Sequence, residues 1–232
     1  MITDYSISVV FPLYNEAGIV EEALLALIAF FRESFREWEI VVVESGSTDH
    51  SPEICDRLAR EHEHIRVFHQ QEREGFGSGV KLGYANARMD LIWVIPPDIC
   101  FPLDSVFRAI PLLEDHDCVL SYRSEDPRSL LRRITSVGFN TLVKTVFGLK
   151  QKHVNSALKL FKADLIKSLP LHSNGWFLDT EILVELRKRG IKYAEIPVVL
   201  IDRTSGESTI KPVTVLAMLR EMFDYLRYHY RK

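Results

Sequence analysis

The sequence predicts an α/β protein built on a mostly parallel sheet. Short runs rich in valine and isoleucine alternate with amphipathic segments through roughly the first 125 residues. This alternation is typical of buried parallel strands joined by helices that cover both faces of a sheet. Polar turns follow the first, second and fourth of these runs. Ligands of such sheets bind at the carboxyl ends of the strands, so the three turns indicate a ligand site.

The first part of the chain is expected to hold five strands and four helices. β-Branched runs predict the strands, at residues 6–11, 39–44, 64–70, 91–95 and 118–123. Apolar residues at helical spacing predict helices at 20–35, 75–88 and 101–115. A Ser or Thr cap followed by Pro52 predicts the start of the remaining helix.

The second part continues without a linker, so one domain is expected over residues 1–211. Its expected elements are a helix at 127–149, a strand at 154–161, a helix at 174–190 and a strand at 192–202. Residues 212–232 form an amphipathic helix that either packs on the core or lies on a membrane. Tyrosine and basic residues near its end favour the membrane interface. Its apolar stripe consists of Val215, Leu216, Leu219, Met222, Phe223 and Leu226.

The composition excludes several classes of protein. Hydrophobic residues make up 47% and charged residues 26% of the chain, as in ordinary folded soluble proteins. A net charge of −3 gives no general attraction for nucleic acid. The three cysteines form no CxxC pair, which argues against structural zinc and fits a reducing compartment. Without a signal peptide or an apolar run of about 20 residues, a cytoplasmic location is expected.

The motifs, taken as an ordered set, resemble a known family. FPLYNE, an acid followed by GSTD, GFGSG and a strand ending in aspartate are similar to family 2 glycosyltransferases of the GT-A fold. SYRS, NSALKLF, GWFLDTEIL and EIPVVLIDRTSGEST resemble dolichol-phosphate mannosyltransferases and their bacterial polyprenyl-phosphate relatives. The resemblance covers residues 5 to about 211.

This resemblance implies a Rossmann-like GT-A domain and an inverting transfer of sugar from a nucleotide sugar. The implied acceptor is a polyprenyl phosphate or another lipid-linked or phosphorylated molecule at the cytoplasmic membrane face. Such a phosphate is already an anionic nucleophile, so a strong general base is less needed than for a hydroxyl acceptor. Residues 212–232 would then contact the membrane surface or a membrane-protein partner.

The resemblance also implies roles for individual residues. Binding of the donor nucleotide is expected from Pro12, Tyr14, Asn15, Glu16, Glu44, Ser45, Gly77 and Asp98. Guanidinium groups suit phosphate, and the candidate acceptor-phosphate residues are Arg123, Arg132, Arg133, Lys159, Arg203, Ser208 and Lys211. The candidate catalytic residues are Asp98, Arg123 and Arg203.

Simpler structural roles compete with some of these assignments. The pair Arg132–Arg133 equally fits a solvated helix face, and glycines such as Gly77 often form only a tight turn. His153 is expected to be structural. Asp179 and Glu181 either point toward the site or cap and face a helix, with the second favoured.

The loop Ile95–Cys100 departs from the family pattern. The usual acid-x-acid pair and glutamine are replaced by Pro96, Asp98 and Cys100, so only Asp98 remains as a hard-oxygen ligand for Mg²⁺ or Mn²⁺. Ser45 likewise replaces an acid. Three alternatives follow: a metal-independent enzyme, an enzyme that holds a metal weakly through Asp98 and the donor diphosphate, or a non-catalytic relative that binds nucleotide, lipid phosphate or an enzyme partner.

Overall fold

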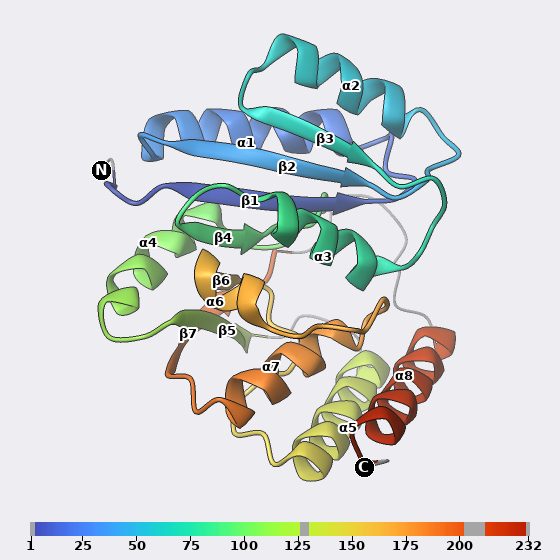
Figure 1. The fold of residues 1–232 in the computed structure, drawn as a ribbon. Helices are drawn as coiled ribbons and strands as arrows, with labels where there is room; N and C mark the ends of the chain where they lie inside the picture. The colour runs from blue at the N-terminus through green and yellow to red at the C-terminus, as the bar shows by residue number, and fades with distance from the viewer. Residues whose placement is uncertain (1–2, 126–129, 202–211, 231–232) are drawn as a thin grey trace.

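The computed structural model describes residues 3–125, 130–201 and 212–230 and is organised around one seven-stranded sheet (Figure 1). The strands are Ile7–Leu13 (β1), Trp38–Glu44 (β2), Ile65–His69 (β3), Leu91–Val94 (β4), Cys118–Glu125 (β5), Lys159–Lys162 (β6) and Tyr193–Val199 (β7). The α-helices are Val20–Ser34 (α1), Ser51–Glu61 (α2), Phe76–Asn86 (α3), Val106–Ala109 (α4), Leu130–Phe147 (α5), Ala163–Ser168 (α6), Leu178–Lys188 (α7) and Pro212–Tyr230 (α8). Two 3₁₀ segments are Leu103–Ser105 (η1) and Ile110–Glu114 (η2).

The sheet has the order β3-β2-β1-β4-β6-β5-β7, and only β6 runs antiparallel to its neighbours. Because β6 pairs antiparallel with both β4 and β5, β5 runs in the same direction as β4. The carboxyl ends of β1, β2, β4, β5 and β7 therefore lie at one edge of the sheet. The expected α/β fold with a mostly parallel sheet is confirmed.

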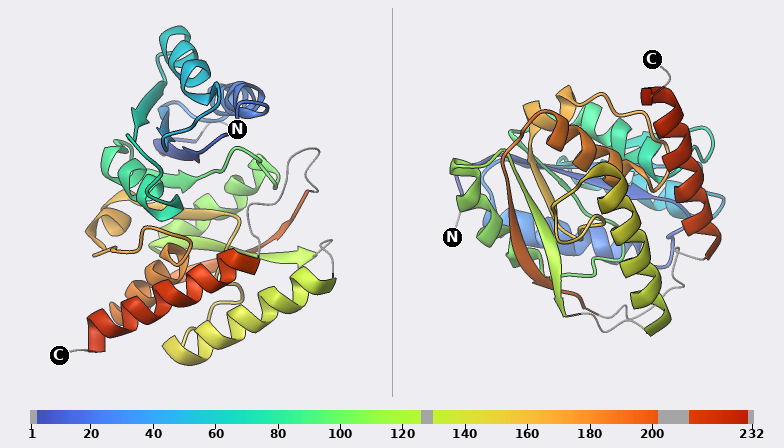
Figure 2. Two further views of the ribbon diagram at one scale, coloured as in Figure 1. Left: turned by 90° about the vertical axis from the view of Figure 1, so that its right-hand side faces the viewer. Right: turned by 90° about the horizontal axis from the view of Figure 1, so that it is seen from below.

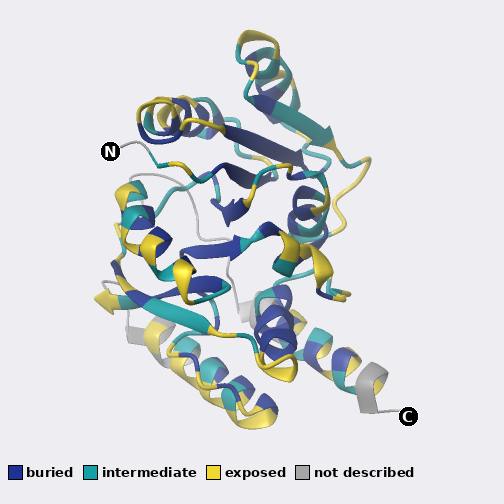
Figure 3. Ribbon diagram, turned by 60° about the vertical axis from the view of Figure 1, so that its left-hand side comes forward, coloured by how far each residue is buried: buried dark blue, intermediate teal, exposed yellow. Residues whose placement is uncertain are grey.

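Helices cover both faces of the sheet, as Figure 2 shows. One apolar core packs α1, α2 and α4 against the sheet, and a second core packs α3, α5, α7 and α8 against the opposite face. Every residue of β1 and β2 is buried, which agrees with their mostly apolar composition (Figure 3). Helix α3 packs so closely on β1 that a Cβ on Gly83 would lie 2.3 Å from Cγ1 of Val10.

Two segments differ from the elements expected from the sequence. Residues 101–115 form η1, α4 and η2 in succession instead of one helix. Pro111 lies in η2, and a proline has no N–H to continue an α-helical ladder. The strand expected at 154–161 begins only at Lys159, and the short helix α6 that follows it was not expected.

The terminal helix α8 lies beside α5 (Figure 2), and one of its faces belongs to the second core. Met218, Met222 and Tyr225 are buried there, whereas Phe223 is 61% exposed. The hydroxyl of Tyr225 donates to Oε1 of Glu185 at 3.0 Å. Within the described residues, no helix is long and apolar enough to cross a membrane.

Candidate functional site

The turns after β1 and β2 are joined by hydrogen bonds through Asn15. Its backbone N–H donates to Oγ of Ser47 at 2.9 Å, and its Oδ1 accepts from the Thr48 N–H at 2.8 Å. Asn15 has a φ of 55°, a conformation that asparagine tolerates better than most residues. The side chain of Asn15 therefore holds the two turns together at the sheet edge, and its proposed contact with nucleotide stays a prediction.

Asp49 joins the same two turns through further hydrogen bonds. Its carboxylate accepts from the N–H groups of Ala17 and Ser51, each at 3.0 Å. Burial alone raises the pKa of Asp49, but the hydrogen bonds from Ser51 and Ala17 outweigh it and hold the pKa below its ordinary value. The GSTD motif, which connects β2 to α2, therefore also holds the turn after β1, and it stays a candidate ligand contact.

The other donor-side candidates lie around this connection. Pro12 is buried inside β1, opposite Val43, and Ser45 is buried directly after β2. The ring of Tyr14 is covered by the guanidinium of Arg73, whose Cζ lies 4.1 Å from the ring centroid. The backbone N–H of Glu16 donates to Oγ of Ser51 at 3.0 Å.

Glu44 is buried at the end of β2 with both carboxylate oxygens in use. Oε1 accepts from the Ser47 N–H at 2.5 Å, and Oε2 lies 3.0 Å from Nδ1 of His69. Burial raises the pKa of Glu44, but the hydrogen bonds from His69 and Ser47 outweigh it, so the pKa is lowered. Glu44 is 2% exposed, which leaves little surface for a direct ribose or base contact in this conformation.

The glycine-rich entry to α3 packs against a distant loop. A Cβ on Gly77 would lie 2.7 Å from the carbonyl oxygen of Gly175, and one on Gly75 would lie 2.4 Å from that of Asn174. Gly75 also has a φ of 110°, which excludes most other residues. The close contact with residues 173–175 already explains why position 77 needs glycine. The proximity of Gly77 to nucleotide stays a prediction.

The loop after β4 forms a turn that carries the half-buried Asp98. The Ile99 N–H donates to the Pro96 carbonyl at 3.2 Å, and the Ile201 N–H donates to the Cys100 carbonyl at 2.9 Å. The second bond brings the chain that leaves β7 beside the Asp98 turn. Arg203, Ser208 and Lys211 follow on this chain but lie outside the described residues.

The Asp98 turn does not supply a preformed metal site. Pro96 has no side-chain oxygen, and the thiol of Cys100 is a poor ligand for a hard cation. No group of three or more His, Cys, Asp or Glu residues suitable for a metal ion occurs in the described part of the chain. Asp98 is the only carboxylate among residues 95–100.

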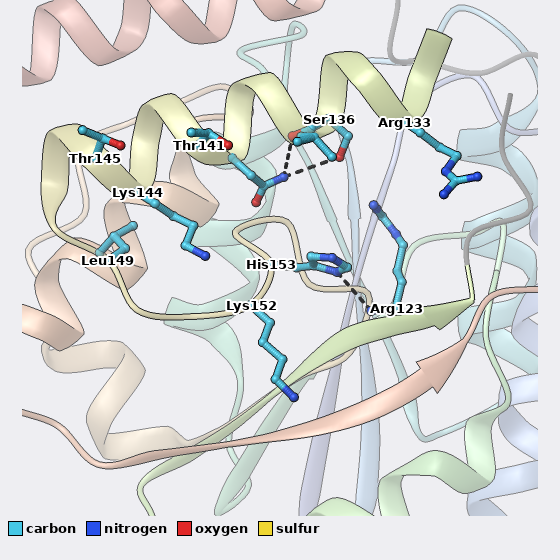
Figure 4. Close-up of a pocket in the computed structure, with 11 residues that line it drawn as sticks. Arg123, Arg133, Ser136, Thr141, Lys144, Thr145, Leu149, Lys152 and His153 are labelled. Atoms are coloured by element: carbon cyan, nitrogen blue, oxygen red, sulfur yellow. Dashed lines mark hydrogen bonds between the residues drawn. The ribbon is translucent and has the colours of Figure 1, made fainter. Parts of the chain in front are cut away.

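A basic cavity of about 500 Å³ lies between β5, α5 and the loop after α5 (Figure 4). Arg123 extends from β5 toward α5, and none of the described residues that line the cavity is acidic. The charged groups in its wall are Arg123, Arg133, Lys144 and Lys152. Arg123 lies near the carboxyl end of β5, which ends at the same sheet edge as β1, β2 and β4. The turns that carry Asn15, Glu44 and Asp98, here called the donor-side turns, lie at this edge.

Hydrogen bonds fix the wall of this basic cavity. Nδ1 of His153 accepts from the Arg123 N–H at 3.0 Å, which requires the ring to carry no proton on Nδ1. Oδ1 of Asn140 accepts from the Val154 N–H at 2.8 Å and so ties the loop to α5. The expected structural role of His153 agrees with its contact with the β5 backbone, although the ring also lines the cavity.

The remaining acceptor-side candidates lie elsewhere or outside the described residues. Nζ of Lys159 pairs with Oδ1 of Asp179 at 2.6 Å, and both side chains are nearly buried. Glu181 is fully buried and accepts from the N–H groups of His172 and Ser173 at 2.9 and 2.8 Å. Neither Lys159 nor Glu181 lines the basic cavity. The side chain of Arg132 lies outside the described residues.

Sequence reasoning missed His69, Lys144 and Lys152. Lys144 had a usable signal, because it follows Arg133 by three turns of one helix and lies on the same face. His69 had none, because its contact with Glu44 joins two strands whose pairing the local pattern does not specify.

The chain is similar in sequence to curated proteins. A dolichyl-phosphate beta-glucosyltransferase of Saccharomyces cerevisiae is 28% identical over 220 residues, covering 83% of this chain and 66% of that protein. An undecaprenyl-phosphate 4-deoxy-4-formamido-L-arabinose transferase of Shewanella sediminis is 27% identical over 223 residues, covering 95% and 65% of the two chains. This chain spans between about a third and two thirds of the length of the curated relatives it matches.

A solved structure has the same fold. Glucosyl-3-phosphoglycerate synthase from Mycobacterium tuberculosis, in complex with Mg²⁺ and uridine diphosphate, superposes with a TM-score of 0.70 at 21% identity. The match covers 97% of this chain and 79% of that one. The model of the family described as glycosyl transferase family 2 matches residues 8–168. With its GT-A fold and its ordered motifs, the chain belongs to glycosyl transferase family 2.

Proposed function

We propose that the protein is an inverting glycosyltransferase that moves a sugar from a nucleotide sugar to a polyprenyl phosphate. The observation that carries the proposal is the basic cavity at the sheet edge where the donor-side turns end. A phosphate acceptor needs a cationic cavity, and guanidinium groups match its oxygen geometry. The names of the two polyprenyl-phosphate relatives support this class of acceptor.

In the proposed reaction, an ionised oxygen of the acceptor phosphate attacks C1 of the sugar. The bond between C1 and the donor's diphosphate breaks, and the nucleoside diphosphate leaves with the bonding electrons. No proton moves, because the nucleophile is already an anion. Catalysis then consists mainly of holding two anions in line and stabilising the charge of the leaving group. Arg123 is proposed to hold the acceptor phosphate.

A second candidate function is binding without chemistry. It is favoured by the replacements at Pro96 and Cys100, which remove two expected ligands from the Asp98 turn. A binding protein of this kind would retain the ordered turns around Asn15 and the basic cavity without transferring sugar.

One experiment separates the two functions. The chain is incubated with UDP-, GDP-, CMP- and dTDP-sugars and a short polyprenyl phosphate in detergent, and the glycolipid is measured by mass spectrometry. Transfer of sugar from any one of these donors supports the enzyme. Binding of a nucleotide sugar by calorimetry, without glycolipid or hydrolysis, contradicts the enzyme and supports the binding protein.

A position on the cytoplasmic membrane face is part of this proposal. Val137, Leu142 and Val146 of α5 and Phe223 of α8 are exposed apolar residues. Together with Arg133 and Lys144 on α5, they suit an anionic lipid surface, where apolar side chains insert and basic groups meet lipid phosphates. Failure of the chain to sediment with anionic vesicles at low salt would contradict this location.

We expect any dependence on Mg²⁺ or Mn²⁺ to be weak. A divalent ion at a diphosphate normally takes one or two protein carboxylates, with phosphate oxygens and waters completing the shell. The Asp98 turn provides one. Calorimetric titration of Mn²⁺ is expected to give no binding to the nucleotide-free chain and weak binding with UDP or GDP present. Tight binding of Mn²⁺ to the nucleotide-free chain would contradict the expectation.

A further inference from the structure

His69 lies between two carboxylates from different elements. Its Nδ1 is 3.0 Å from Oε2 of Glu44 on β2, and its Nε2 is 3.0 Å from Oδ1 of Asp56 on α2. An imidazolium donates from both ring nitrogens, whereas a neutral imidazole has only one N–H. The two contacts are therefore both satisfied only when His69 is protonated.

The three groups differ in their access to solvent. The Glu44 side chain is almost completely buried, whereas those of His69 and Asp56 are 41% and 47% exposed. A proton can thus reach or leave His69 directly from solvent, while Glu44 has no other charged partner among its hydrogen bonds within the described part of the chain. The charge of His69 decides whether the buried carboxylate is neutralised.

The contacts of Glu44 continue into the donor-side turns. Oε1 of Glu44 accepts from the Ser47 N–H, and Oγ of Ser47 accepts from the Asn15 N–H. A continuous series of hydrogen bonds therefore connects Asp56 at the surface, through His69 and Glu44, to the turn after β1. These contacts join His69 to both turns.

We propose that His69 is a positioning residue whose protonated ring holds Glu44 and thereby fixes the turns at 14–16 and 44–49. What these turns bind rests on the proposed function. Loss of the proton changes the summed charge of Asp56, His69 and Glu44 from −1 to −2. The donor's diphosphate is itself anionic, so nucleotide affinity is expected to fall as His69 loses its proton.

The two carboxylates also favour the protonated form of His69. Burial lowers the pKa of His69, but its hydrogen bonds to Glu44 and Asp56 outweigh burial and raise the pKa above the ordinary value of 6.5. Because the pKa is raised in the folded chain, the stabilising contribution is complete below about 6.5 and is lost as the pH rises through the folded value. Burial, with Glu44, Asp56 and Asp49 nearby, raises the pKa of the adjacent Cys55 to about 12, so this thiol stays neutral.

Other charged groups also face this region. Glu72, Glu74 and Lys81 line a cavity of about 590 Å³ together with His69. Burial lowers the pKa of Lys81, against the opposing effect of Glu181 and Glu74. Within the described residues, the ring of His69 is hydrogen-bonded to Glu44 and Asp56 and to none of these three. The test must therefore separate His69 from these neighbours by substitution.

NMR titration of the full chain between about pH 6 and pH 9 tests the positioning role without any ligand. The amide resonances of Ser47 and Asn15 are expected to shift with the same midpoint as the imidazole of His69. In Asp56→Asn, which removes one negative partner, both midpoints are expected to move to lower pH together. In His69→Gln, which has an amide donor but does not titrate in this range, the shifts are expected to disappear. Amides that do not follow the imidazole, or that still titrate in His69→Gln, would overturn the proposal.

Binding of UDP and GDP, measured by calorimetry at about pH 6 and pH 9, then tests the consequence. The dissociation constant is expected to rise at least about threefold at the higher pH in the unmodified chain and to stay flat in His69→Gln. An equal rise in both proteins would overturn the role of His69 in nucleotide binding. If neither of these nucleotides binds at either pH, and CMP and dTDP do not bind either, the proposed function is contradicted, while the NMR titration still decides whether His69 holds the turns.

Discussion

Replacing Arg123 with alanine is expected to lower kcat/KM for sugar transfer by roughly 100- to 1000-fold, the range for loss of one hydrogen-bond donor to a charged reacting group. Arg123 extends into the basic cavity from the end of β5. Arg123→Lys is expected to recover only part of this loss, because an ammonium keeps the charge but lacks the planar fork of donors. Steady-state kinetics with varied polyprenyl phosphate provide the measurement.

The substitution leaves the local backbone contact intact, since the Arg123 group that donates to His153 is the N–H. A matched control is Arg57→Lys, because Arg57 is a surface arginine on α2 that pairs with Glu21 and Glu61 and does not line the cavity. This control should keep unmodified kinetics. Unchanged kcat/KM in Arg123→Lys would contradict the assignment of the cavity to the acceptor phosphate.

The parts of this structure that local patterns specify were predictable from the sequence. The β-branched runs of β1 and β2 are buried on both faces, so their composition alone identifies them. Their parallel direction then brings the turns near Asn15 and Thr48 to one edge, where the two residues contact each other. The expectation that the turns after parallel strands meet at one sheet edge was therefore confirmed for β1 and β2.

Contacts between segments that no local pattern links were not predictable. The antiparallel strand β6 enters between β4 and β5, and a short apolar run does not specify its neighbours. Lys159 was assigned to the phosphate because of its motif, yet the nearest charged group is Asp179 on α7. Glu44 was expected to contact nucleotide, which stays a prediction, and its contact with His69 from the next strand was not expected. In each case the partner lies about 20 residues or more away.

Replacing Met222 with alanine is expected to lower the free energy of unfolding by about 2–5 kcal/mol. Met222 is 4% exposed and belongs to the second core. Truncation there removes buried methylene and thioether contacts and leaves a cavity between α8 and the rest of that core. Urea denaturation followed by circular dichroism, with equal m-values in the two proteins, provides the measurement.

Phe223→Ala is the matched control, because it removes an even larger apolar side chain from the next position of the same helix. Phe223 is 61% exposed, so the free energy of unfolding should change by no more than about 0.5 kcal/mol. Both substitutions introduce alanine, so helix propensity changes in the same direction and the difference between them reports packing. If α8 also lies on a membrane, Phe223→Ala should reduce sedimentation with anionic vesicles while Met222→Ala, at a temperature where it stays folded, should not. Equal stability losses would mean that the two faces of α8 are not divided between core and solvent as the burial of Met222 indicates.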